Sequence, residues 1–267
     1  MRPVELLETW LDARLDGAAR AWLRDALARL RSAATERELY LFVSQVARRV
    51  GKAPLALGAA ELRAASASRP GWDPLDWTAD NAARVLLLLA SSTDGGAVRA
   101  RLDTLCSAAD VDELVAFYRG LPLYPDPPCH ALRAAEGVRS NMRVVFEAVA
   151  HRNPYPAEQF DEPAWNQMVL KALFVGSTLE PVAGLDARRN PALARMLCDY
   201  AHERWAARRV VSHELWRCVG PYATGAVLDD FRRLLAAGTA EERRAARAAL
   251  AESPDPQAAH LLASAPG

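Results

Sequence analysis

Apolar side chains recur at helical spacing along almost the whole chain of 267 residues. Thr35 and Glu38 are spaced as in a capping box, and an apolar stripe follows them. The stripe comprises Leu39, Phe42, Val43, Val46, Ala47 and Val50. Because side chains three and four residues apart share a helix face, this pattern predicts an amphipathic helix. Alternating runs of β-branched residues, which would indicate strands, do not occur in the sequence. We therefore predict an all-α fold.

Other helix starts and the breaks between helices indicate how the helices are arranged. Further N-terminal signals are Thr78, Asp110 with Glu113, Asn190 before Pro191, and Thr239 with Glu242. Short breaks occur at 94–96, 121–128, 184–190 and 253–254. Short links make successive helices antiparallel neighbours. We expect stacked antiparallel helices that form either an α-solenoid of HEAT-like repeats or an irregular multi-helix bundle.

Two irregular segments suggest how the chain is organised. SRPGWDPLDWT, from Ser68 to Thr78, carries two tryptophans among proline and glycine and predicts a packed loop. GLPLYPDPPCH, from Gly120 to His130, carries four prolines and is the best candidate for a boundary. We predict a helical framework over 1–120, a distinctive segment over 121–222, and HEAT-like helices over 223–267 packed on it, all in one continuous domain.

Charge, cysteines and hydropathy exclude several classes of protein. Lys and Arg total 33, as do Asp and Glu, so no overall field attracts nucleic acid or an anionic membrane. The four cysteines have no close spacing, which predicts neither a metal clip nor a disulfide framework. The N-terminus does not resemble a signal peptide, and the longest apolar run, Val85–Ala90, is too short to span a bilayer. We expect a soluble, cytoplasmic protein without metal, cofactor or transmembrane segment.

Lysine is rare in this chain. Arginine occurs 31 times, whereas lysine occurs only at Lys52 and Lys171. Under such a bias, a position that needs only positive charge is usually filled by arginine. Both lysines are therefore weak candidates for sites where a planar guanidinium would not serve.

Polar and aromatic residues concentrate between Asn141 and Tyr222. This segment holds four of the five asparagines, three of the five histidines and three of the seven tryptophans. Such residues line small-molecule pockets and partner grooves. They equally suit an irregular segment whose side chains bond to its own backbone. The sequence leaves both interpretations open.

Nine residues of this segment are candidates for ligand binding. They are Asn153, Tyr155, Trp165, Asn166, Lys171, His202, Arg204, Trp216 and Arg217. Lys171 and His202 are also the candidate catalytic residues. Asp199 lies three residues before His202, so the two side chains share a helix face. The pair is interpreted in one of three ways: as a surface ion pair, as a general base oriented by a carboxylate, or as part of a metal site. Lys171 is either a compact donor in a confined space or a side chain whose ammonium reaches water along an apolar helix.

The segment also resembles a known family. NPYPAEQFDEPAWNQMVLKALFVGSTLEPVAGLD, NPALARMLCDYAHERWAARR and ELWRCVGPY are similar to the signature of EboA proteins, a bacterial family encoded in gene clusters assigned to metabolite traffic. The resemblance is specific over about Asn153–Tyr222 and loose elsewhere. It implies an accessory protein of secondary-metabolite precursor handling or traffic. Its partners would be products of the same gene cluster or a small metabolite, and it assigns no catalytic residue.

Two functions remain as hypotheses. The first is a helical scaffold that binds a metabolite or a partner enzyme through a polar and aromatic site. The second is an enzyme with an unusual site built from Lys171 and His202, because burial lowers the pKa of a lysine and makes it a nucleophile. A nucleic-acid-binding helical repeat is excluded, since acidic residues match the arginines in number.

Overall fold

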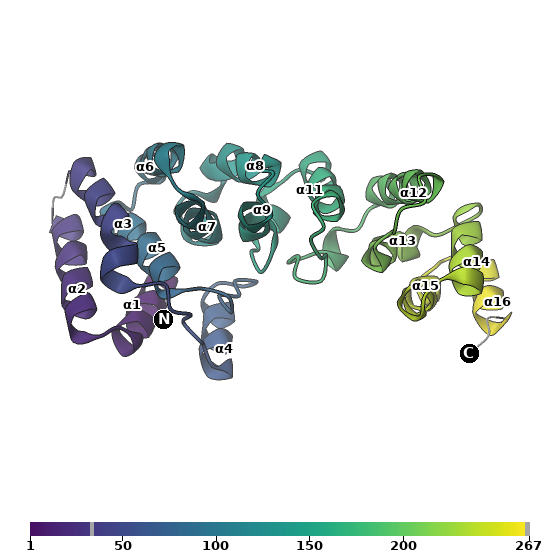
Figure 1. The fold of residues 1–267 in the computed structure, drawn as a ribbon, viewed down its shortest axis with the longest axis horizontal. Coiled ribbons are helices and arrows are strands. Elements are labelled where there is room, and N and C mark those ends of the chain that lie inside the picture. The colour runs from purple at the N-terminus through teal and green to yellow at the C-terminus, as the bar shows by residue number, and fades with distance from the viewer. Residues whose placement is uncertain (33–34, 265–267) are drawn as a thin grey trace. The chain divides into compact units, whose positions relative to one another are not determined.

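The computed structural model describes residues 1–32 and 35–264 (Figure 1). It is 73% helical, and the described residues form 16 α-helices and no strand beyond one isolated bridge between Pro54 and Thr78. The prediction of an all-α, multi-helix fold is therefore confirmed. None of the described helices has both the length and the apolar character needed to cross a membrane.

The helices pack into two compact units, unit 1 over Met1–Asp161 and unit 2 over Glu162–Gly267. Unit 1 contains α1 (Pro3–Arg14), α2 (Gly17–Ser32), α3 (Glu36–Val50), α4 (Ala59–Ser68), α5 (Ala79–Ser91), α6 (Gly95–Ala108), α7 (Val111–Arg119), α8 (Ala131–Arg139), α9 (Arg143–Ala150) and α10 (Tyr155–Gln159). Unit 2 contains α11 (Glu162–Phe174), α12 (Pro191–Ala206), α13 (Trp216–Val219), α14 (Val227–Ala237), α15 (Ala240–Ala251) and α16 (Pro256–Ser264). Short 3-10 helices lie at Leu121–Leu123, Pro127–His130, Asp186–Arg188, His213–Leu215 and Gly220–Tyr222.

This division falls inside the segment 121–222, whose residues contribute to both units. The proline-rich stretch Gly120–His130 lies within unit 1, where it forms two 3-10 helices and buries Tyr124 and His130. Residues 265–267 of the predicted third segment lie outside the described residues. HEAT-like repetition over 223–264 stays a prediction.

The predicted helix starts are confirmed, and capping contacts accompany them except at Thr78, which begins α5 without a side-chain capping bond. Capping boxes form at Thr35 with Glu38, at Asp110 with Glu113 and at Thr239 with Glu242. Asn190 accepts a hydrogen bond from the amide of Leu193 at the start of α12. These contacts satisfy backbone amides that the first helical turn leaves without partners.

The core of unit 1 is built around α5. Ten of its residues, Ala79–Leu88, are buried, and the helix packs against α1, α2, α3 and α7. The pairs α3–α5, α5–α7 and α7–α9 each pack side by side. The predicted packed loop lies beside this core, since Trp72 and Trp77 are only 1% and 4% exposed. This packing brings the start of α5, the helix α7 and the end of α9 close to the loops that carry Lys52 and residues 73–78.

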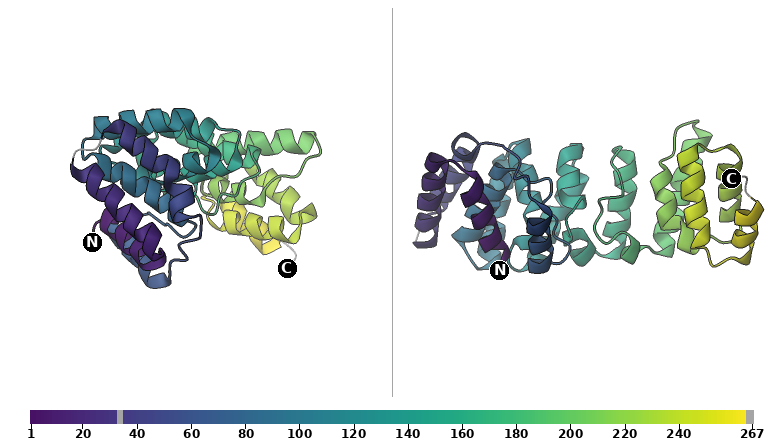
Figure 2. Two further views of the ribbon diagram at one scale, coloured as in Figure 1. Left: turned by 60° about the vertical axis from the view of Figure 1, so that its left-hand side comes forward. Right: turned by 90° about the horizontal axis from the view of Figure 1, so that it is seen from below.

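Unit 2 has its own apolar core. Its helices pack as the pairs α11–α12, α12–α13, α13–α15, α14–α15 and α15–α16. Both views of Figure 2 show the three C-terminal helices, coloured yellow-green to yellow, running alongside one another. Trp165 on α11 and Trp216 on α13 are fully buried in this unit, together with Phe231 on α14.

Candidate functional site

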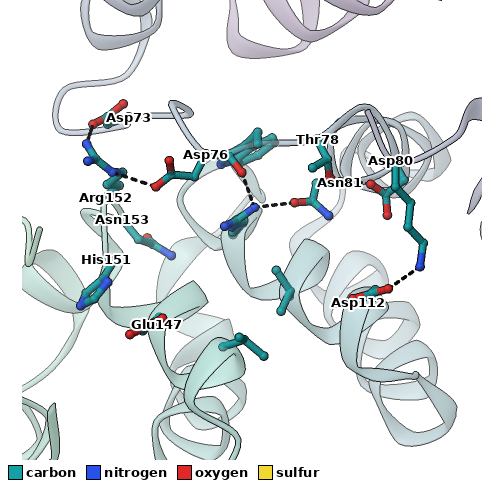
Figure 3. Close-up of a pocket in the computed structure, with 15 residues that line it drawn as sticks. Asp73, Asp76, Thr78, Asp80, Asn81, Asp112, Glu147, His151, Arg152 and Asn153 are labelled. Carbon is teal, nitrogen blue, oxygen red and sulfur yellow. Dashed lines mark hydrogen bonds and ion pairs between the residues drawn. The ribbon is translucent and has the colours of Figure 1, made fainter. Parts of the chain in front are cut away.

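A polar cleft of about 390 Å³ lies in unit 1, among α5, α7, α9 and the loops that precede or follow them (Figure 3). Helices and loops distant in sequence contribute its walls. The lining residues are Lys52, Asp73, Asp76, Trp77, Thr78, Asp80, Asn81, Asp112, Val115, Arg119, Val144, Glu147, His151, Arg152 and Asn153. Its volume falls within the range of small-molecule sites.

Two loops form one rim of the cleft. The chain leaves α3 at Gly51, whose φ of 78° lies in the region that favours glycine, and Lys52 follows immediately. The amide of Leu55 then donates to the carbonyl of Trp77, at 2.9 Å, which holds this loop against the loop before α5. Lys52 and residues 76–78 thus lie on two loops that are bonded to each other, and all of them line the cleft.

A buried ion pair anchors the start of α5. Asp80 and Arg84 are each 2% exposed, and a guanidinium nitrogen of Arg84 donates to Asp80 at 2.5 Å. The hydroxyl of Thr78 donates to the other carboxylate oxygen of Asp80. A carboxylate in the first turn of a helix is also stabilised by the helix dipole. Asp80 is therefore held rigidly, because removing either partner would leave a buried charge uncompensated.

Arg119, at the end of α7, connects this helix to α5 and to the neighbouring loop. Its guanidinium donates to the carbonyl of Asp76, at 2.7 Å, and to the side-chain oxygen of Asn81, at 2.6 Å. Desolvation lowers the pKa of Arg119. Asn81 is only 4% exposed, and its amide nitrogen has no hydrogen-bond partner among the described residues. That nitrogen is the donor left available to a bound molecule.

Arg152 ties the end of α9 to the loop before α5, as Figure 3 shows. Its side chain donates to Asp73 at 2.5 Å and to Asp76 at 3.0 Å, and its backbone carbonyl accepts from the amide of Asp73. The φ of Arg152 is 52°, a left-handed conformation that is strained for a residue other than glycine. Strain of this kind persists where surrounding contacts overdetermine the backbone, as they do here.

Lys52 reaches from its loop to Asp112 on α7 and forms an ion pair with it. The hydrogen bond that the ammonium of Lys52 donates to Asp112 raises the pKa of Lys52, so the side chain stays protonated. A protonated amine is a hydrogen-bond donor and not a nucleophile. One of the two rare lysines thus lies on the cleft, where it acts as a compact cation.

Asn153 also lines the cleft, but its side-chain amide is occupied by backbone groups. Its nitrogen donates to the carbonyls of Tyr118 and Ala148, and its oxygen accepts from the amide of Tyr155. The hydroxyl of Tyr155 donates to the carbonyl of Pro127. Both side chains are buried, so the structure places them as connections between α7, α9 and α10.

In unit 2, Trp165 and Asn166 also have local partners. The guanidinium of Arg188 lies over the ring of Trp165, 4.9 Å from its centroid. Asn166 and Asn190 exchange two amide hydrogen bonds, at 3.1 and 2.8 Å, while Asn190 caps α12. These contacts join α11 to the start of α12.

The two candidate catalytic residues of unit 2 differ in their surroundings. Lys171 is partly exposed on α11, has no hydrogen-bond or ion-pair partner among the described residues, and has a pKa lowered by desolvation. His202 on α12 is hydrogen-bonded to both carboxylate oxygens of Asp230, at 2.8 and 2.9 Å. Asp230 lies on α14, so helical spacing indicated the wrong partner when it pointed to Asp199.

The last three predicted site residues, Arg204, Trp216 and Arg217, belong to separate contacts in unit 2. Arg204 donates twice to the carbonyl of Val210, and Arg217 forms a bidentate ion pair with Asp186. Trp216 is buried. Of the nine predicted site residues, Asn153 is the one that lines the cleft in the described part of unit 1.

Sequence reasoning missed most of the cleft. Asn81, Asp112 and Arg119 come from parts of the chain that looked like ordinary helices. Asp76 and Arg152 lie in segments that the sequence singled out, but neither residue was predicted to belong to a site. Two signals were available to find it. The rarity of lysine pointed to Lys52, which lines the cleft. Asn81, the single asparagine outside the polar and aromatic segment, is the second lining residue that composition could have indicated.

Comparison with known proteins identifies the family. A family model described as "Metabolite traffic protein EboA" matches residues 3–220. The match therefore includes the whole cleft as well as the segment that first suggested the resemblance. No match to the chain was found among the curated proteins or the solved structures. Because the family model covers most of its length, the chain belongs to the family of the metabolite traffic protein EboA.

Proposed function

We propose that the protein handles a small metabolite by holding it in the cleft of unit 1, as an accessory protein of precursor handling or traffic. The observation that carries this proposal is the cleft itself, in which paired polar groups, buried at Asp80 and Asn81 and half-exposed at its rim, surround an open volume of about 390 Å³. Its ion pairs orient donors and acceptors before a ligand arrives, which reduces the entropic cost of binding. The family's description as metabolite traffic agrees with such a role.

The ion pairs around the cleft favour binding over reaction. Lys52 is held protonated by Asp112, and Asp80 is held by Arg84. Groups committed in this way position a ligand but do not exchange protons readily near neutral pH. We place the function in the cytoplasm, where the four free cysteines would stay reduced. Products of the same gene cluster are its expected protein partners.

The direct test is to identify what the purified protein carries. The wild-type chain is isolated without denaturation, and small molecules released from it are analysed by mass spectrometry. Asn81→Asp keeps the oxygen that accepts from Arg119 and removes the available donor, so the fold should persist while the bound molecule is lost. Asn141→Asp, the same change at an exposed position of unit 1, is the matched control and should retain it. Equal retention by both variants would contradict the proposal.

An enzyme built on Lys171 is the second candidate. It is favoured by one observation, the pKa of Lys171 lowered by desolvation with no partner among the described residues. Lowering the pKa of a lysine favours its neutral amine, the form that attacks carbonyl carbons to give a Schiff base and release water. Borohydride added to the protein together with a carbonyl metabolite would trap that adduct as a mass increase. If the protein is such an enzyme, Lys171→Arg abolishes both the trapped adduct and the function of the gene cluster. If it only binds a metabolite, the same change leaves the fold and metabolite binding unchanged.

A further inference from the structure

We infer that the ligand of the cleft is a neutral, polyhydroxylated small molecule, an inference that rests on the proposed binding function. The first observation is the balance of charge around the cleft. Its lining contains five carboxylates, those of Asp73, Asp76, Asp80, Asp112 and Glu147. Each bonds to a cationic side chain, and these partners are Arg152 for the first two, then Arg84, Lys52 and Arg143.

Arg119 completes the charge count. With it, the five carboxylates face five cations, Lys52, Arg84, Arg119, Arg143 and Arg152, and the sum is zero. Glu113 lies 3.7 Å from Arg84, and including it gives a single negative charge. The described residues around the cleft therefore provide no net positive charge to stabilise a phosphate or carboxylate inside it. An anion would lose hydration in a site without net positive charge, and Arg119, which bonds to no carboxylate of the described residues, already donates to the carbonyl of Asp76 and to Asn81. An anion is therefore disfavoured.

A cationic ligand meets the opposite difficulty. The carboxylates of Asp73 and Asp76 share Arg152, and that of Asp112 is bonded to Lys52. An amine could gain a full charge partner only by displacing one of these side chains. A neutral ligand avoids this cost, because it leaves every ion pair of the cleft in place.

Hydroxyl groups suit the hydrogen-bonding pattern that remains. A hydroxyl donates one hydrogen bond and accepts others, so it can bond to both members of a carboxylate–guanidinium pair at once. The unpaired amide nitrogen of Asn81 supplies a further donor. Val115, Val144 and Trp77 give the cleft an apolar wall for the C–H face of a carbon ring or chain. Several hydroxyls on a compact carbon skeleton would use all of these groups.

The experiment compares matched ligands that differ in charge. Glucose and myo-inositol, their monophosphates, and glucosamine are titrated into the wild-type protein by calorimetry at constant ionic strength. We expect at least one neutral member to bind about tenfold more tightly than its phosphorylated counterpart and than glucosamine. Tighter binding of the phosphates or of glucosamine would overturn the inference, as would the absence of neutral binding at about 10 mM.

Asn81→Asp tells the charge classes apart within the same site. The change replaces the available donor by a charged acceptor, so it should weaken binding of the neutral ligand by about tenfold. A cationic ligand would bind the variant more tightly than the wild type, which is the opposite result. Asn141→Asp should leave all affinities unchanged. If the purified protein carries a charged metabolite that Asn81→Asp loses, the proposed function stands while the neutral class is wrong.

Discussion

Asn153→Ala tests whether this asparagine holds the fold together or contacts the ligand. The side chain is 3% exposed and makes three hydrogen bonds to backbone groups, of 3.0, 3.1 and 3.0 Å. Each such bond contributes about 0.5–1.5 kcal/mol, so their combined loss is about 3 kcal/mol. The substitution also leaves two carbonyls and one amide without side-chain partners in a buried place, which raises the cost further.

This loss is a large share of the free energy of unfolding of an ordinary domain, which is about 5–15 kcal/mol. Urea denaturation followed by circular dichroism should show a markedly lower midpoint for Asn153→Ala. Asn141→Ala, at an exposed position of the same unit, should change the free energy by less than about 0.5 kcal/mol. A loss below about 1 kcal/mol for Asn153→Ala, accompanied by loss of the bound metabolite, would refute the structural role and return Asn153 to the ligand site.

Three further predictions concern stability. Burial lowers the pKa of His130, so the unfolded chain binds a proton more readily than the folded chain. The free energy of unfolding should therefore fall as the pH drops below about 6.5, and His130→Gln should flatten this dependence in urea titrations at several pH values. Thr239→Ala removes the capping box of α15 and should cost about 1 kcal/mol by urea denaturation, and no change would contradict the capping contact. Trp216→Ala empties a fully buried position and should cost about 3–5 kcal/mol, so a thermal melt close to that of the wild type would be inconsistent with its packing.

The sequence by itself determined the helices and their starts. Capping pairs such as Thr35 with Glu38 lie three residues apart, so their contacts form within one helical turn whatever the rest of the chain does. Thr78 likewise indicated where α5 begins. The family resemblance could be recognised in the same way, because it depends on strings of residues and not on their positions in space.

Only the tertiary structure decided which polar residues are available to a ligand. Asn153 and Asn166 belong to a segment rich in polar and aromatic residues, yet one bonds to backbone groups and the other to a second asparagine. Composition cannot distinguish a polar side chain that connects helices from one that faces a cavity, because both are buried and hydrogen-bonded.

The residues that line the cleft could not be grouped from the sequence either. Lys52, Asn81, Asp112 and Arg152 lie far apart along the chain, and no local pattern relates them. They meet because α5 packs against α3 and α7, and α7 against α9, which brings the loops at the ends of these helices together. The ion pairs that balance the charge of the cleft join residues up to 79 positions apart, as in Arg152 with Asp73. Such long-range pairing depends on how the helices stack, and that is decided by the shapes of their buried faces.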